Sequence, residues 1–163
     1  MKLSLKIRFG LVLWPCLVLM LAGGSIRAQT ALVFRLDGGP STYAFGVNER
    51  GELQTLYWGG RLGAHDTIPP AHSLPEWASF DSPATTTPQE YSGWGAGLFT
   101  EPALKVSFAD GNRDLVLHFV KATPNGSHAI DVLLKDISRE IYVTLRYSMD
   151  PESGILARSE SME

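Results

Sequence analysis

The chain has 163 residues, of which 44% are hydrophobic and 19% are charged, and its formal net charge is −3. This length suits one ordinary domain. The negative net charge makes nucleic acid or an anionic membrane surface a poor partner, and a single cysteine excludes an internal disulfide.

Residues 1–28 have the layout of a secretory signal peptide. Three basic residues precede an apolar run over residues 11–24, and cleavage is predicted after Ala28. The run is shorter than the about 20 residues that a membrane span needs, and Pro15 interrupts it, so an uncleaved anchor is the less favoured alternative. Cleavage would remove four basic residues and the cysteine, leaving 10 basic against 17 acidic residues, a net charge of −7. We therefore expect an exported domain, periplasmic or extracellular, over residues 29–163, with no metal or cofactor.

The first part of this domain is predicted to be a meander of three strands. Short runs rich in β-branched and aromatic residues cover 31–36, 42–47 and 52–58, and the turn signals "DGGPS" and "NERG" separate them. The chain from 59 to 88 has five prolines and no clear periodicity. We predict a long ordered loop here, although structureless loops of this length are uncommon in compact domains and tend to be either functional or disordered.

The C-terminal half alternates apolar and polar residues at a period of two, which is typical of half-buried strands. One hairpin is predicted from 103–108 and 115–119 around "DGNR", and a second from 130–134 and 141–148. A last strand at 155–160 is expected to be an edge strand. The pattern predicts an all-β fold, an antiparallel β-sandwich.

The residues that could carry chemistry form no complete catalytic or metal-binding pattern. Gly93, Gly95 and Gly97 precede a predicted strand, whereas a phosphate-binding loop leads into a helix. The four histidines lack zinc-type spacing. Carboxylates could act in pairs in glycoside hydrolysis, but those in or near the long loop are interpreted as solvated: Asp66, Glu76, Asp81, Glu90 and Glu101.

Tryptophans are the other candidates, because an exposed indole can stack on a sugar ring. Trp58 ends a predicted strand and is interpreted as a buried anchor, as is Trp94 in its turn, whereas for Trp77 burial and sugar binding are equally open. The sequence Asn125-Gly126-Ser127 is formally a glycosylation acceptor, but a turn is the favoured interpretation.

Three blocks follow one another along the chain: "LYWGGRL" at 56–62, "QEYSGWGAGLFTEPALKVSFADGNRDLVLHFV" at 89–120 and "LLKDISREIYVTLRYSMDPESGILARS" at 133–159. Together they resemble the N-terminal domain of glycoside hydrolase family 36, the bacterial-type α-galactosidases. The positions that we take as the structural signature of this resemblance are Trp58, Glu90, Tyr91, Trp94, Glu101 and Pro102.

The resemblance implies a β-sandwich of the supersandwich type that precedes a (β/α)₈ catalytic barrel. Enzymes of this family remove terminal α-galactosyl units with two carboxylates and retention of configuration. Both carboxylates lie in the barrel, so the resemblance implies no catalytic residue here and an inactive chain. The implied partners are the barrel, an α-galactoside oligosaccharide and further copies of the same chain in a homo-oligomer.

The resemblance also implies that the sandwich is incomplete at its C-terminus, as a fragment or a natural truncation. In some family members the segment after Tyr-Trp-Gly lends a residue to a sugar pocket, and the candidates here are Asp66, Trp77 and Asp81. Two alternatives stay open: a free-standing carbohydrate-binding module, and an inert, poorly folded truncation with apolar surface in water.

Overall fold

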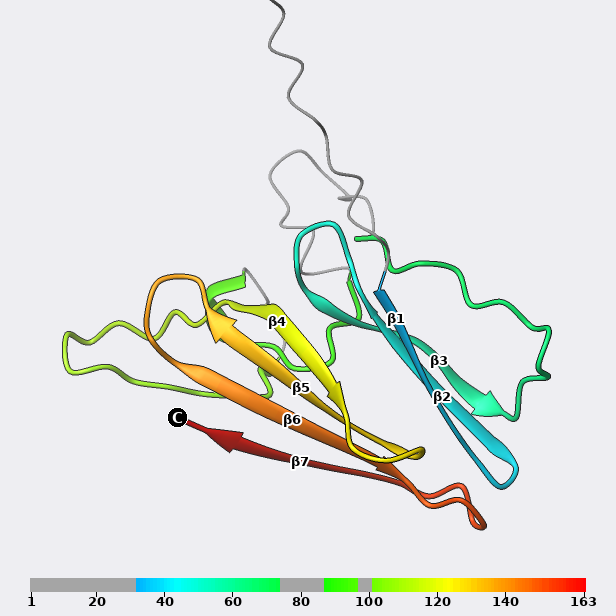
Figure 1. Cartoon of the computed structure of the whole chain (residues 1–163). Helices are drawn as coiled ribbons and strands as arrows, with labels where there is room; N and C mark the ends of the chain where they lie inside the picture. The colour runs from blue at the N-terminus through cyan, green and yellow to red at the C-terminus, as the bar shows by residue number, and fades with distance from the viewer. Residues whose placement is uncertain (1–31, 74–86, 97–100) are drawn as a thin grey trace, which may run out of the picture.

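The structure is a computed structural model that describes residues 32–73, 87–96 and 101–163 (Figure 1). It contains two antiparallel sheets with strand orders β1-β2-β3 and β4-β5-β6-β7. This architecture confirms the predicted all-β antiparallel sandwich. The strands are β1 (Leu32–Gly38), β2 (Ser41–Val47), β3 (Leu53–Gly60), β4 (Leu117–Pro124), β5 (Ala129–Asp136), β6 (Tyr142–Met149) and β7 (Leu156–Met162).

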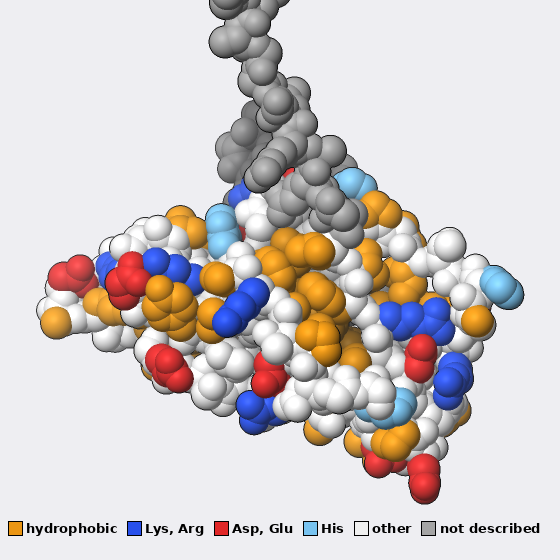
Figure 2. Space-filling model, viewed as in Figure 1, with side chains coloured by type: hydrophobic (Ala, Val, Ile, Leu, Met, Phe, Trp, Pro, Cys, Tyr) orange, Lys and Arg blue, Asp and Glu red, His pale blue; other side chains and the backbone are white. Residues whose placement is uncertain are grey.

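The hydrophobic core of the described residues lies between the inner faces of the two sheets. Phe45 of β2 stacks on Tyr147 of β6 with ring centroids 4.5 Å apart, and both side chains are completely buried. On β5 and β6 every second residue is buried, as the sequence alternation predicts. On the face seen in Figure 2, hydrophobic side chains gather between the sheets while many charged ones lie toward the margins.

The turns hold the two sheets together at one end. Gly39, in the β1–β2 hairpin with φ +46°, donates its N–H to the carbonyl oxygen of Pro151 at 2.8 Å. A Cβ on the preceding Gly38 would lie 2.2 Å from the backbone oxygen of Asp150, so only glycine permits this approach. The β1–β2 hairpin and the β6–β7 turn are therefore fixed against each other.

The predicted hairpin from 103–108 and 115–119 is only partly correct. Its turn forms, because Phe108 donates to the carbonyl oxygen of Asn112 at 2.9 Å. Residues 101–116 nevertheless belong to no strand, because their backbone groups bond elsewhere: Leu104 donates to Ser92 and Val116 to the Asp136 carboxylate. The alternation of apolar and polar residues still reflects burial, because the apolar residues at 104, 106 and 108 pack against the core.

The last strand, β7, is an outer strand of its sheet, as the sequence predicts. Within the ranges that the structure describes, the only helical element is the 3-10 turn Trp94–Ala96, and no helix is long and apolar enough to cross a membrane. The predicted signal peptide lies outside the described residues, so its cleavage stays a prediction.

Candidate functional site

The backbone around Glu90 extends the first sheet and places this side chain between the sheets. Thr55 of β3 donates its N–H to the carbonyl oxygen of Pro88 at 2.9 Å, and Glu90 donates to that of Leu53 at 2.9 Å. Gln54 and Gln89 form an antiparallel bridge between these hydrogen bonds. The segment therefore acts as a short additional strand beside β3, and Glu90 points into the sandwich.

The Glu90 carboxylate is fully buried and accepts hydrogen bonds from both sheets. Tyr43 of β2 donates its hydroxyl at 2.6 and 2.7 Å, Tyr147 of β6 donates at 3.0 Å, and the hydroxyl of Thr55 also donates. Arg158 of β7 lies 3.5 Å from the carboxylate and donates to the Glu90 carbonyl oxygen at 3.0 Å. One side chain thus links β2 and β3 to β6 and β7.

Electrostatics explain why both tyrosines stay protonated. Burial raises the pKa of Tyr43 well above the usual 10, and the hydrogen bond to Glu90 raises it further. Burial also raises the pKa of Tyr147, followed by the negative charge of Glu90. The hydroxyls are therefore fixed hydrogen-bond donors, and the carboxylate has little capacity left to bind a ligand.

This finding corrects the interpretation of Glu90 as a solvated loop acid. The partners of Glu90, which are Tyr43, Tyr147 and Arg158, were not predicted from the sequence. Tyr43 and Tyr147 occupy inward positions of alternating strands, where a phenol normally finds a hydrogen-bond partner. A search for carboxylates that could serve two inward tyrosines could have found the cluster.

Trp58 is the second correction, because the side chain interpreted as a buried anchor is 73% exposed. Its ring meets Tyr43 edge-on, with centroids 5.9 Å apart and an interplanar angle of 89°. Trp58 pairs with Tyr43 near the end of β3, beyond the residues that pair with the segment around Glu90, and burial falls off along this strand. The indole therefore contacts Tyr43, while most of its surface is exposed.

The rest of the signature forms a local packing unit. Tyr91 packs against the core, and Trp94 is partly buried with the Lys105 ammonium 5.9 Å from its ring centroid. Lys105 also pairs with the exposed Glu101, whereas Pro102 is buried. The packing of Tyr91 supports its interpretation as an anchor of the turn, whereas for Trp94 this interpretation stays a prediction.

The glycines at 93 and 95 serve close packing. A Cβ on Gly93 would lie 2.3 Å from the backbone oxygen of Leu115, and a Cβ on Gly95 would lie 2.8 Å from the backbone nitrogen of Leu115. Gly95 in turn donates its N–H to Leu115 at 3.2 Å. The glycine-rich stretch thus lets two backbone segments touch.

Asp66 lies in a loop that is tied firmly to β1. Arg35 donates to the carbonyl oxygens of Leu62 at 2.6 Å and Gly63 at 3.2 Å. Asp66 is exposed, and its carboxylate accepts the N–H of Gly63 at 2.7 Å. The loop is therefore fixed at its start, with an acidic side chain at the surface.

The other two sugar-contact candidates, Trp77 and Asp81, lie outside the described residues, so the structure does not test whether they meet Asp66. Among the described residues, no group of three or more His, Asp or Glu side chains could hold a metal ion. The buried Glu90 cluster and the exposed Trp58 are thus the features that the structure adds to the predicted site.

Together, the fold and this geometry define a β-sandwich domain whose most elaborate polar cluster is structural. The glycosyl hydrolase family 36 N-terminal domain matches residues 51–163. The chain therefore belongs to this family, which confirms the resemblance drawn from the three sequence blocks. A search of curated proteins found no match.

Solved structures of α-galactosidases share the fold. The enzyme from Lactobacillus brevis aligns over 82% of this chain with a TM-score of 0.67 and 21% identity. Variants of AgaA from Geobacillus stearothermophilus align over 80% with a TM-score of 0.65, at 22% identity for the raffinose complex and 21% for the stachyose complex. This chain covers 22% of the length of each of these proteins.

Proposed function

We propose that this chain is the non-catalytic N-terminal domain of an exported α-galactosidase, where it packs on a catalytic barrel, contributes oligomer contacts and shapes the rim of the sugar pocket. The observation that carries the proposal is the family match over residues 51–163. The solved structures that share the fold are α-galactosidases, two of them in complex with raffinose or stachyose. An α-galactoside oligosaccharide is accordingly the substrate class of the whole enzyme.

The loop after β3 supports the role at the pocket rim. Arg35 fixes the loop start, while Asp66 stays exposed on it and leads toward Trp77 and Asp81. A loop that is already fixed can present polar side chains to a neighbouring domain, because little entropy is then lost in ordering the loop on binding.

The coding sequence that follows codon 163 tests the assignment as a domain. We expect it to encode further sandwich strands and then a barrel of alternating strands and helices. A downstream sequence that encodes an unrelated protein in its own reading frame would contradict this proposal.

A free-standing carbohydrate-binding module is the second candidate, and the exposure of Trp58 favours it. An aromatic ring that is 73% exposed can stack on the apolar face of a sugar. Titration of the chain with raffinose should then change its tryptophan fluorescence, and Trp58→Ala should abolish the change while Trp94→Phe preserves it. An unchanged spectrum at millimolar sugar would eliminate this candidate.

A further inference from the structure

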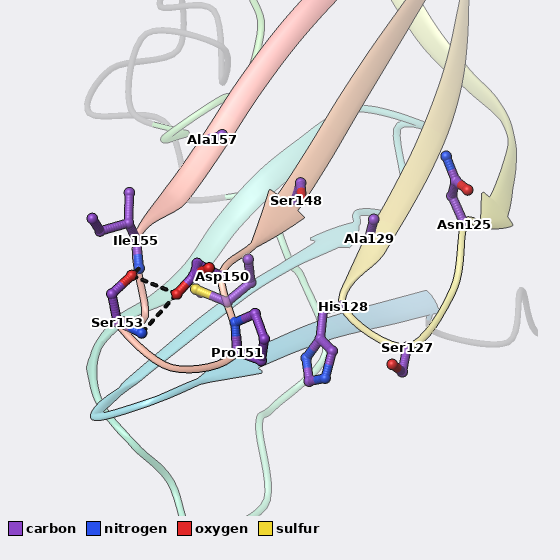
Figure 3. Close-up of a pocket in the computed structure, with 11 residues that line it drawn as sticks. Asn125, Ser127, His128, Ala129, Ser148, Asp150, Pro151, Ser153, Ile155 and Ala157 are labelled. Atoms are coloured by element: carbon purple, nitrogen blue, oxygen red, sulfur yellow. Dashed lines mark hydrogen bonds between the residues drawn. The ribbon is translucent and has the colours of Figure 1, made fainter.

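The β4–β5 hairpin forms one lip of an open cleft of about 580 Å³ on the second sheet (Figure 3). Ala129, Ser148 and Ala157 line the cleft from three adjacent strands, and they are paired with one another across the sheet. Asn125 and Ser127 line it from the hairpin loop. A covalent change to the side chains of the hairpin loop would therefore alter the lining of this cleft.

The loop presents Asn125 to solvent together with the backbone of Gly126. Both residues are exposed, and Gly126 has φ +84° with no atom within 4 Å of where a Cβ would stand. The Asn125 N–H bonds to the carbonyl oxygen of Ala129 at 2.9 Å. Within the described part of the chain, neither the Asn125 carboxamide nor the Gly126 N–H has a hydrogen-bond partner.

The other two asparagines are held in a different way. The Asn48 side chain is buried, and its carbonyl oxygen accepts the N–H groups of Arg50 and Glu52 at 3.0 Å. Asn112 is exposed in a turn like Asn125, but its side-chain oxygen accepts the N–H of Asp114 at 2.6 Å, and Arg113 follows it. Only Asn125 combines exposure, a free carboxamide and a following glycine.

We infer that Asn125 is a site of spontaneous deamidation and isomerisation. The Gly126 nitrogen gives up its proton to base and attacks the side-chain carbonyl carbon of Asn125. A C–N bond forms, and the side-chain nitrogen leaves as ammonia, which gives a cyclic imide. Water then opens the ring at either carbonyl group and leaves aspartate or isoaspartate. Glycine favours the attack because it has no side chain to hinder the ring closure.

The products change the cleft in two ways. Either one places a new negative charge on the β4–β5 loop, in the wall of a cleft that Asp150 of the β6–β7 turn also lines. Isoaspartate also lengthens the backbone three residues before His128, whose carbonyl oxygen accepts the Met149 N–H at 2.8 Å and whose Nδ1 lies 3.0 Å from the Asp37 carbonyl oxygen. The modification thus bears on a contact between the sheets.

The test is to age the full chain in mildly alkaline buffer and to map its peptides by mass spectrometry. The peptide with Asn125 should gain the mass of an NH₂-to-OH exchange and split into two chromatographic products. Asn125→Gln should abolish the gain, because a glutamine forms the larger ring far more slowly, and Gly126→Ala should slow it several-fold. The peptides with Asn48 and Asn112 serve as controls inside the same molecule.

Two outcomes would overturn the inference. One is an Asn125 peptide that keeps its mass while the chain ages. The other is an equal gain at Asn112, because this would show that solvent exposure alone controls the reaction. Both readouts are independent of sugar binding and of hydrolysis, so they leave the proposed function untouched.

Discussion

Replacement of Glu90 by alanine should destabilise the chain strongly, although this residue lies outside every strand. The substitution leaves the buried hydroxyls of Tyr43 and Tyr147 without their acceptor. Each such loss costs about 1–3 kcal/mol. Arg158 is 42% exposed and can return to water, so its share is small. We expect the free energy of unfolding to fall by about 3 kcal/mol in total.

Urea denaturation followed by circular dichroism measures this loss. Glu101→Ala is the matched control, because Glu101 belongs to the same signature but is exposed, and it should change the free energy by less than about 0.5 kcal/mol. Tyr43→Phe should cost less in the Glu90→Ala background than in the parent chain, because the hydroxyl there has already lost its acceptor. An equal small effect of Glu90→Ala and Glu101→Ala would refute the account of Glu90 as the link between the sheets.

Three further predictions concern the same core. Because burial raises the pKa of Tyr43 and Tyr147, these tyrosines lose their protons at lower pH in the unfolded chain than in the folded chain. The free energy of unfolding should therefore be constant below pH about 10 and fall at higher pH. Urea titrations at pH about 8 and about 11 measure this difference, and equal values would contradict it. Gly93→Ala should lower the free energy of unfolding by about 2 kcal/mol or more, because its Cβ would collide with the backbone oxygen of Leu115. Gly60→Ala is the control, because a Cβ there meets open space. Similar melting temperatures of the two variants would argue against the close packing at Gly93. Trp58→Ala should lower the free energy by about 1 kcal/mol or less, since the indole is mostly exposed, and a loss as large as that of Glu90→Ala would show that it is buried in solution.

Sequence patterns predicted the strands where the alternation has a single physical cause. On β5 and β6 one face meets the core and the other meets water, so apolar and polar residues alternate and the pairing follows. The alternation at 104–108 has the same form, but these residues pack on the core without pairing as a β-strand. The N–H of Leu104 bonds to Ser92 and the N–H of Val116 bonds to Asp136, so these groups do not pair across the turn. Periodicity reports which face is buried; it does not identify the hydrogen-bond partner.

The candidate site was harder to predict because it depends on contacts between distant residues. The Glu90 cluster joins side chains 47 and 57 positions apart along the chain, which no local pattern encodes. Trp58 was misplaced for a related reason: the end of a strand gives no information about what covers it. In contrast, the three blocks identified the family because several residues of each block match the family in the same order along the chain.

The most direct test of the central claim is an assay of the purified 163-residue chain with p-nitrophenyl α-galactoside. A domain that supports a catalytic barrel but contains no catalytic pair of its own should show no turnover above that of a mock preparation. Turnover that persists at constant specific activity through repurification would contradict the claim and would locate a catalytic site within this chain.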